Sequence, residues 1–294
     1  MNQKIVRLPF LQNILNLAIL GIIALVCAFP ILHTLALSLS SAGAAASGRV
    51  TIWPVEFTTQ SYRFVLENPA FMKSFGISLQ RVLVGVPVNM ILTILVAYPL
   101  SRPIQKFRQR DFFAWFFLIT VLFSGGLIPF YMVVRQTGLI DSFWALIIPG
   151  AVPVFNIILL VNTFRNIPRE LEEAAAMDGA GHWTILFKVL IPMSIPILAT
   201  LTLFVAVSHW NSWFDGLILM NSPEKYPLQS YLQTVIINPD PRFMSERYLA
   251  LLRMISNRTT RAAQIFIAMI PIMVIYPFLQ RFFVTGIKLG SVKG

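Results

Sequence analysis

The side chains that could carry chemistry are few in this sequence, and most of them stand alone among apolar residues. A glycine-rich phosphate-binding loop and a dinucleotide-binding glycine motif are both absent, and no His, Cys, Asp or Glu residues show metal-ligand spacing. His33, His182 and His209 are scattered, and a structural or interfacial role suits each of them better than ligation. The sequence therefore predicts no catalytic residues, no metal site and no cofactor bound by this chain.

Two features nevertheless place polar groups within or beside long apolar stretches. Arg81 lies about one turn inside one such stretch, and a polar-aromatic run that ends at Asp215 closes another. Ionisable groups at such positions usually face a cavity or a partner, because lipid cannot solvate them. We predict a polar path formed by Arg81, Trp210, Asn211 and Asp215. Two alternatives stay open: Arg81 could snorkel to the outer surface, and Trp213 could belong to an interfacial aromatic belt.

The amino-acid composition indicates whether these elements are surrounded by water or by lipid. Of the 294 residues, 56% are hydrophobic and 12% are charged, whereas about 25% are charged in an average soluble domain. Such a chain cannot cover a globule with polar surface, which indicates a membrane protein in contact with lipid. The net charge of +11 would suggest nucleic acid in a soluble protein, but here it indicates loops that face anionic headgroups. The single cysteine, Cys27, excludes an internal disulfide.

The apolar stretches predict an all-α integral membrane fold, one domain over residues 1–294, with about six transmembrane helices. Each stretch approaches the roughly 20 residues that span a bilayer. A cleaved signal peptide is the competing interpretation of the first stretch, but its apolar core is too long for one. Prolines within nearly every stretch favour a transporter over a rigid anchor. The predicted spans are residues 14–37, 77–100, 112–134, 143–164, 190–220 and 262–283.

The short loop after the second span predicts the orientation. It carries Arg102, Lys106, Arg108 and Arg110 against one acid, Asp111, and basic short loops stay on the cytoplasmic side. With six spans, both termini and the loop 167–189 are then cytoplasmic. The prediction depends on this loop, because the basic residues summed over all loops show no clear bias.

The loop between the fourth and fifth spans predicts a short helix followed by a turn. Pro168 suits a first helical turn, three glutamates follow near the positive end of the helix dipole, and Ala174–Ala176 are strong helix formers. Gly179 can adopt the left-handed conformation that ends a helix. A second helical stretch from Trp183 then enters the membrane. The small side chains would let another protein approach closely, although a capped loop helix without a partner is an equally good interpretation.

The segment Glu173-Ala174-Ala175-x-x-Asp178-Gly179-Ala180, followed by Leu190-x-Pro192, resembles the EAA loop of ABC importer permeases. In that family the loop forms coupling helices that sit in a groove of the ATP-binding subunit. The resemblance implies that Glu173, Ala174, Ala175, Asp178 and Gly179 contact the ATPase. It also implies two permease subunits, two ATPases that bind ATP and Mg, an extracytoplasmic binding protein, and a place in the bacterial inner membrane. This chain would be a non-catalytic subunit that touches lipid and no nucleic acid.

Several further segments resemble the carbohydrate-importer branch of this family. They are 97–102, 125–129, Trp210-Asn211, 226–229 and 286–294, and together they are most similar to permeases for complex oligo- and polysaccharides, the alginate importers among them. Aromatic rings can stack on sugar faces, and Asn and Asp can bind hydroxyls, so the predicted polar path becomes a candidate substrate path. The outer segment 221–261 has six basic and three acidic residues, which suggests an anionic substrate or an acidic binding protein.

Three other functions stay open from the sequence. A permease of the same superfamily could carry a non-sugar solute, although Trp210-Asn211 and the carboxyl-terminal segment argue against it. A stand-alone secondary transporter would usually show internal repeats or more charge within its spans. A membrane enzyme would need catalytic residues gathered at one membrane face, and the sequence shows no such set.

Overall fold

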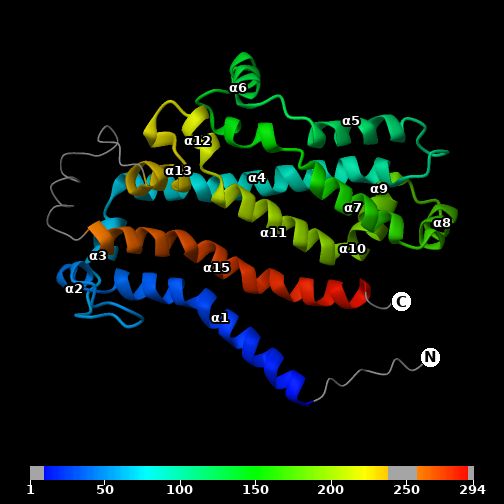
Figure 1. Ribbon diagram of the computed structural model, residues 1–294. Coiled ribbons are helices and arrows are strands. Elements are labelled where there is room, and N and C mark those ends of the chain that lie inside the picture. The colour runs from blue at the N-terminus through cyan, green and yellow to red at the C-terminus, as the bar shows by residue number, and fades with distance from the viewer. Residues whose placement is uncertain (1–9, 238–256, 291–294) are drawn as a thin grey trace. The chain divides into compact units, whose positions relative to one another are not determined.

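The computed structural model describes residues 10–237 and 257–290 (Figure 1), and every element in these two ranges is helical. Contacts group the chain into two units, one of residues 1–69 and 240–269 and the other of residues 70–239 and 270–294. Residues 238–256 of the outer segment 221–261, among them the basic residues Arg242, Arg247 and Arg253, lie outside the described residues.

The first unit contains the predicted first span. Helix α1 runs over Phe10–Ser38 and stays continuous through Pro30, and none of its apolar window is buried. A compact loop follows, with the short helices α2 (Ala42–Ala46) and α3 (Gln60–Leu66). Ser38 and Tyr62 join the end of α1 to α3 by a hydrogen bond of 2.7 Å between their hydroxyls. The apolar surface of α1 is therefore available to lipid or to another subunit.

The second unit is organised along α4 (Pro69–Ser101), which extends the predicted second span by eight residues at its amino end. Figure 1 shows α4, in cyan, passing behind α11 and α7. Its buried positions recur every three or four residues, which is one face of a helix. Most of the side chains on this face are small or polar: Ser74, Ser78, Arg81, Gly85, Asn89, Thr93, Ala97 and Ser101. This face lets neighbouring elements approach α4 closely and places polar groups between them.

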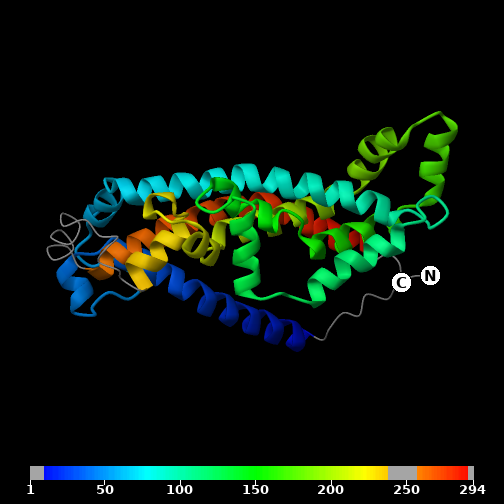
Figure 2. The ribbon, with the colours of Figure 1, turned by 90° about the horizontal axis from the view of Figure 1, so that it is seen from above.

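The predicted span 112–134 is divided between two helices. Helix α5 (Arg110–Leu122) ends before an extended turn, and α6 (Leu127–Gln136) starts again in another direction, as Figure 2 shows. Gly126 takes a positive φ of 86° in this turn, which glycine adopts at little cost. A helix of 13 residues, such as α5, is about 20 Å long and too short to span a bilayer alone.

The fourth and fifth predicted spans are also interrupted. The fourth consists of two 3₁₀ turns, η1 (Phe143–Leu146) and η2 (Ile148–Gly150), and helix α7 (Val154–Asn166), bent by 47°. The fifth bends by 83° between α10 (Ile191–Met193) and α11 (Ile195–Asn211), and α12 (Phe214–Leu219) follows a second break. Pro149, Pro153, Pro192 and Pro196 lie at or beside the two bends, where each removes a backbone donor.

The described residues therefore contain three helices able to cross a membrane, or five if each bent pair is one span. The last is α15 (Asn257–Gly290), whose window Arg258–Pro277 passes the test. Residues 221–237 form the short turns η4 (Pro223–Lys225), α13 (Leu228–Leu232) and η5 (Gln233–Ile237). Lys225 and the backbone N–H of Asn221 both donate to the Asp141 carboxylate and lower its pKa, which ties this segment to the loop after α6.

Candidate functional site

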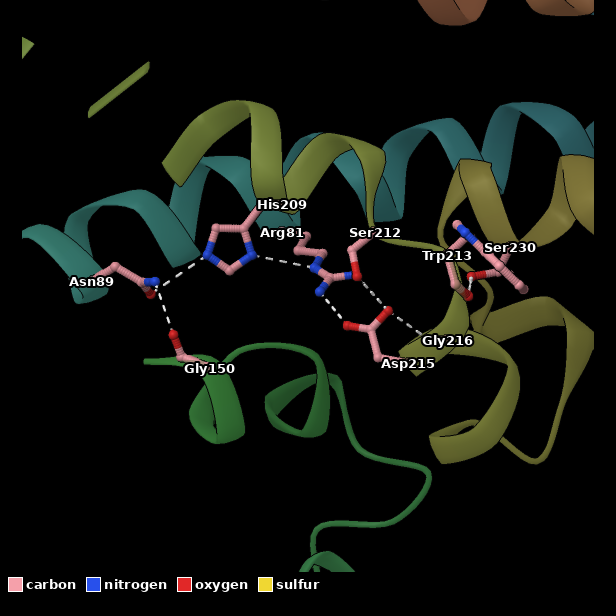
Figure 3. Close-up of polar contacts among 9 residues, drawn as sticks. All are labelled: Arg81, Asn89, Gly150, His209, Ser212, Trp213, Asp215, Gly216 and Ser230. Atoms are coloured by element: carbon pink, nitrogen blue, oxygen red, sulfur yellow. Dashed lines mark hydrogen bonds and ion pairs between the residues drawn. The ribbon is translucent and has the colours of Figure 1, made fainter. Parts of the chain in front are cut away.

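A buried ion pair joins α4 to α12 (Figure 3). Both Nη atoms of Arg81 donate to the Asp215 carboxylate, Nη1 over 3.2 Å to Oδ1 and Nη2 to Oδ2. Arg81 is 4% exposed and the Asp215 side chain 22%. The Ser212 hydroxyl and the backbone N–H of Gly216 also donate to Asp215, over 2.8 and 2.9 Å. The first turn of α12 therefore orients the carboxylate, and the arginine does not snorkel to a surface.

His209 extends this pair into a chain of hydrogen bonds in which each side chain donates to the next. Arg81 Nε can only donate, so His209 Nδ1, at 3.3 Å, must accept. The imidazole proton is then on Nε2, which lies 3.4 Å from Asn89 Oδ1 and donates to it. The Asn89 amide donates in turn to the Gly150 carbonyl over 3.1 Å. This chain connects α4, α11 and η2, and it requires the neutral form of His209, because a second ring proton would face Arg81.

The network forms part of the wall of a cavity of about 490 Å³ within the second unit. Apolar side chains complete the wall, including Phe130 of α6, Phe155 of α7 and Phe204 of α11. The polar lining residues are Arg81, Asn89, Asn156, Ser208, His209, Ser212 and Asp215. Hydroxyls, amides and one ion pair around a largely apolar wall are the groups that bind and orient a polyhydroxylated ligand.

Only two of the four residues predicted for the polar path line this cavity. Arg81 and Asp215 do, although they are 134 positions apart. Trp210 is 2% exposed and packs edge-on against Phe75 of α4, with ring centroids 5.6 Å apart. Asn211 is exposed at the end of α11. Neither Trp210 nor Asn211 is among the lining residues, so a role for them in the path stays a prediction.

The sequence interpretation missed the position of His209, which it treated as a structural or interfacial residue. A signal was present, because Arg81, Gly85 and Asn89 follow one another at intervals of four and therefore share one face of a helix. Three such residues in an apolar helix indicate a polar contact across that face. Which neighbouring element supplies the partner cannot be read from α4 alone.

Gly85 allows the imidazole to lie against α4, which gives a testable expectation. A Cβ at this position would lie 2.6 Å from His209 Nε2 and under 3.0 Å from two ring carbons. We expect Gly85→Ala to displace the ring and destabilise the protein by about 1–3 kcal/mol, as overpacking does. Gly76→Ala in the same helix is the control, since nothing lies within 4 Å of its Cβ. Melting temperatures of the purified variants measure both effects, and equal values for the two would contradict the contact.

The loop between α7 and α11 has the predicted helix and turn. Helix α8 spans Arg169–Met177, and α9 (His182–Ile185) leads through a π turn, η3 (Leu186–Leu190), into α10. The N–H of Ala180 donates to the Ala175 carbonyl over 2.9 Å, and that of Gly179 to Ala176 over 3.0 Å. With a φ of 83° at Gly179, these bonds form a Schellman cap. Glu173, Ala174, Asp178 and Gly179 are exposed, whereas Ala175 is half-buried against the apolar core of the unit.

Two contacts attach this helical hairpin to the end of α4. Arg102 pairs with Glu172, and their side chains are only 10% and 12% exposed. The Arg102 guanidinium also lies over the Tyr98 ring, 4.7 Å from its centroid, and the Tyr98 hydroxyl is 3.0 Å from His182 Nδ1. Figure 2 shows α8 and α9 standing out from that end of the unit. The basic loop 102–110 and the α8–α9 hairpin therefore lie at the same end of α4.

The long apolar helices, the bent spans and the capped hairpin define a transporter membrane subunit. Residues 9–289 match the family described as "Binding-protein-dependent transport system inner membrane component", and the chain belongs to this family. It is thus the permease component of a binding-protein-dependent ABC importer.

Two relatives from Bacillus subtilis match over nearly the whole chain. The polygalacturonan/rhamnogalacturonan transport system permease protein YtcP is 38% identical over 92% of this chain and 94% of its own length. Protein LplC is 36% identical over 96% of this chain and 95% of its own length. Among solved structures, a chain of a bacterial ABC transporter involved in the import of the acidic polysaccharide alginate superposes with a TM-score of 0.86. That chain is 35% identical, and the match covers 96% of this chain and 99% of the other.

Proposed function

We propose that this chain is one of two permease subunits that carry an acidic oligo- or polysaccharide across the bacterial inner membrane. Alginate is named as an acidic polysaccharide, and polygalacturonan is built of acidic sugars, so two of the three matches point to ligands with carboxylates. An extracytoplasmic binding protein would deliver the ligand, and two partner ATPases would bind ATP and Mg. Both termini and the α8–α9 hairpin would face the cytoplasm.

The polar wall of the cavity is the observation that supports the proposed substrate class. Arg81 uses three of its five N–H groups for His209 and Asp215, so one N–H on each Nη atom has no partner among the described residues. The Asn156 amide also lines the cavity, is 6% exposed and makes no side-chain hydrogen bond within the described part of the chain. These donors suit the carboxylates and hydroxyls of a uronic-acid chain.

The exposed surface of α8 supports the proposed contact with the ATPase. Glu173, Ala174, Asp178 and Gly179 would meet the ATPase groove, with Ala175 holding the helix against its own unit. The Arg102–Glu172 pair would pass the motion of α8 to α4. The unburied apolar surfaces of α1 and α5 would meet lipid and the second permease subunit.

Asn156→Leu tests the substrate path without touching the ion pair. We expect the reconstituted transporter carrying this substitution to lose most of its ATPase stimulation by binding protein loaded with an acidic oligosaccharide, because the cavity loses a donor. Asn162→Leu on the same helix is the matched control, since Asn162 is exposed and does not line the cavity. Unchanged stimulation in Asn156→Leu would contradict the path, and equal stimulation of the unsubstituted transporter by neutral and acidic oligosaccharides would contradict the substrate class.

A further inference from the structure

A second hollow, of about 280 Å³, lies between the loop 102–110 and the corner where α7 meets α8. Its volume is separate from the cavity of the ion pair, and the two share no lining residue. The side chains of Arg102, Lys106, Arg110, Arg165 and Arg169 line it together with those of Glu172 and Glu173. The ionisable lining therefore has a formal charge of +3.

Part of this positive charge is not neutralised inside the protein. Arg102 pairs with Glu172, and Arg110 pairs with Asp111. Lys106, Arg165 and Arg169 form no ion pair with any described residue. The Arg165 guanidinium instead donates to the neutral Leu100 carbonyl over 2.9 Å, which points it toward the end of α4 and keeps it at the wall of the hollow.

The surface beside the hollow is apolar. Helix α5 begins at Arg110, one of the lining residues, packs against α7 and has no buried residue. Phe112, Trp115 and Phe116 near its start are all more than half exposed. Figure 1 shows α5 leading away from the loop 102–110. A basic hollow that opens beside an exposed apolar helix matches the two halves of an anionic lipid, whose headgroup is charged and whose chains are apolar.

We propose that this hollow binds the phosphate headgroup of an anionic lipid from the membrane leaflet on the side of α8, with the acyl chains along α5. Arginine and lysine both bind phosphate, the former through paired N–H donors and the latter as a point charge. The bound headgroup bridges Lys106 of the loop to Arg169 of α8. It thereby adds a lipid-dependent contact between the coupling helix and the membrane surface, beside the Arg102–Glu172 pair.

The double variant Lys106→Gln/Arg169→Gln tests the site in the complete transporter in detergent, titrated with phosphatidylglycerol and measured by native mass spectrometry. Each basic residue near an anionic surface contributes about fivefold, so we expect the affinity to fall about 30-fold. In the single variant Lys106→Gln the affinity for phosphatidylglycerol should fall about fivefold. Because Lys106 lies outside α8, this variant shows the effect on lipid binding even if the double variant loses its ATPase subunits. Arg108→Gln is the matched control, because Arg108 belongs to the same loop and is exposed but does not line the hollow.

Three results would overturn the proposal. One is phosphatidylglycerol binding in the double variant that equals that of the unsubstituted transporter. Another is an equal loss of phosphatidylglycerol affinity in Arg108→Gln, since that would show that the lipid is attracted by the general surface charge and not by a defined site. The third is displacement of the lipid by inorganic phosphate at similar concentration, since that would show a site for soluble anions. Phosphatidylcholine, which has no net charge, should bind equally to all variants.

Discussion

Asp215→Ala should destabilise the protein by about 3–5 kcal/mol, because it leaves the Arg81 guanidinium buried without its counter-charge. Arg81 is 4% exposed and has no other carboxylate partner among the described residues. The substitution also strands two donors, the Ser212 hydroxyl and the Gly216 N–H, that now point at Asp215. The expected readout is a large fall in the melting temperature of the purified protein in detergent.

The double variant Arg81→Met/Asp215→Leu separates the ion pair's effect on stability from its effect on transport. Replacing both members of a buried pair by apolar residues of similar volume is often neutral, so we expect the melting temperature to recover. Transport should stay lost, because the cavity has lost its charged donors. Glu224→Gln is the control, because it breaks the ion pair that Glu224 forms with Lys73, another residue of α4. The side chains of Lys73 and Glu224 are 55% and 78% exposed, so this substitution should leave the melting temperature unchanged. A melting temperature unaffected by Asp215→Ala would show that Arg81 is solvated and not paired.

Gly179→Val should uncouple the permease from its ATPase. Position 179 has a φ of 83° and open space around the missing Cβ, so valine would not clash within this chain. It would cost about 1–2 kcal/mol of backbone strain and would place a branched side chain on the proposed docking surface. We expect the affinity for the ATPase subunit to fall by about tenfold or more, as when the centre of an interface loses its packing. Co-purification in mild detergent and ATP-driven uptake in vesicles measure the loss.

Two further substitutions distinguish strain from docking. Gly138 follows α6 with a φ of 71° and equally open space, so Gly138→Val has the same backbone strain away from α8. It should retain the ATPase. Gly179→Asn tolerates the left-handed conformation but adds bulk, so it should reduce co-purification with little effect on the melting temperature. If Gly138→Val and Gly179→Val lost the ATPase equally, general instability would explain both and the docking surface would be wrong.

The sequence predicted the elements whose signals are local. The uninterrupted apolar runs of α1 and α4, the small residues and Gly179 cap of α8, and the all-helical class follow from composition and spacing within about 30 residues. The bends within the fourth and fifth spans could not be predicted from composition and spacing. Pro87 and Pro99 lie within a continuous α4, whereas Pro192 and Pro196 flank a bend of 83°. The outcome depends on whether neighbouring groups satisfy the backbone carbonyls that each proline frees, and those neighbours are distant in sequence.

The candidate site was predicted in part for a similar reason. Arg81 and Asp215 were recognised because charge among apolar residues is costly, but their pairing depends on tertiary structure. His209 and Trp210 are adjacent in a run where every residue is polar or aromatic, and neighbouring helical positions point about 100° apart. Nothing in that run determines which of the two faces the cavity. The packing of α11 against α4 decides it, with His209 over Gly85 and Trp210 against Phe75.

The length and continuity of α4 have a mechanical consequence. Arg81, which holds the cavity network, lies about a third of the way along α4, and Arg102, which holds α8, directly follows the last residue of the helix. The two positions are about 30 Å apart along the helix axis at 1.5 Å per residue. A continuous helix is stiff along its axis, so we expect a movement of α8 that acts on Arg102 through Glu172 to be transmitted along α4 to Arg81. The polar cavity and the α8–α9 hairpin are therefore attached to one continuous helix, and we expect the orientation of each to constrain the other.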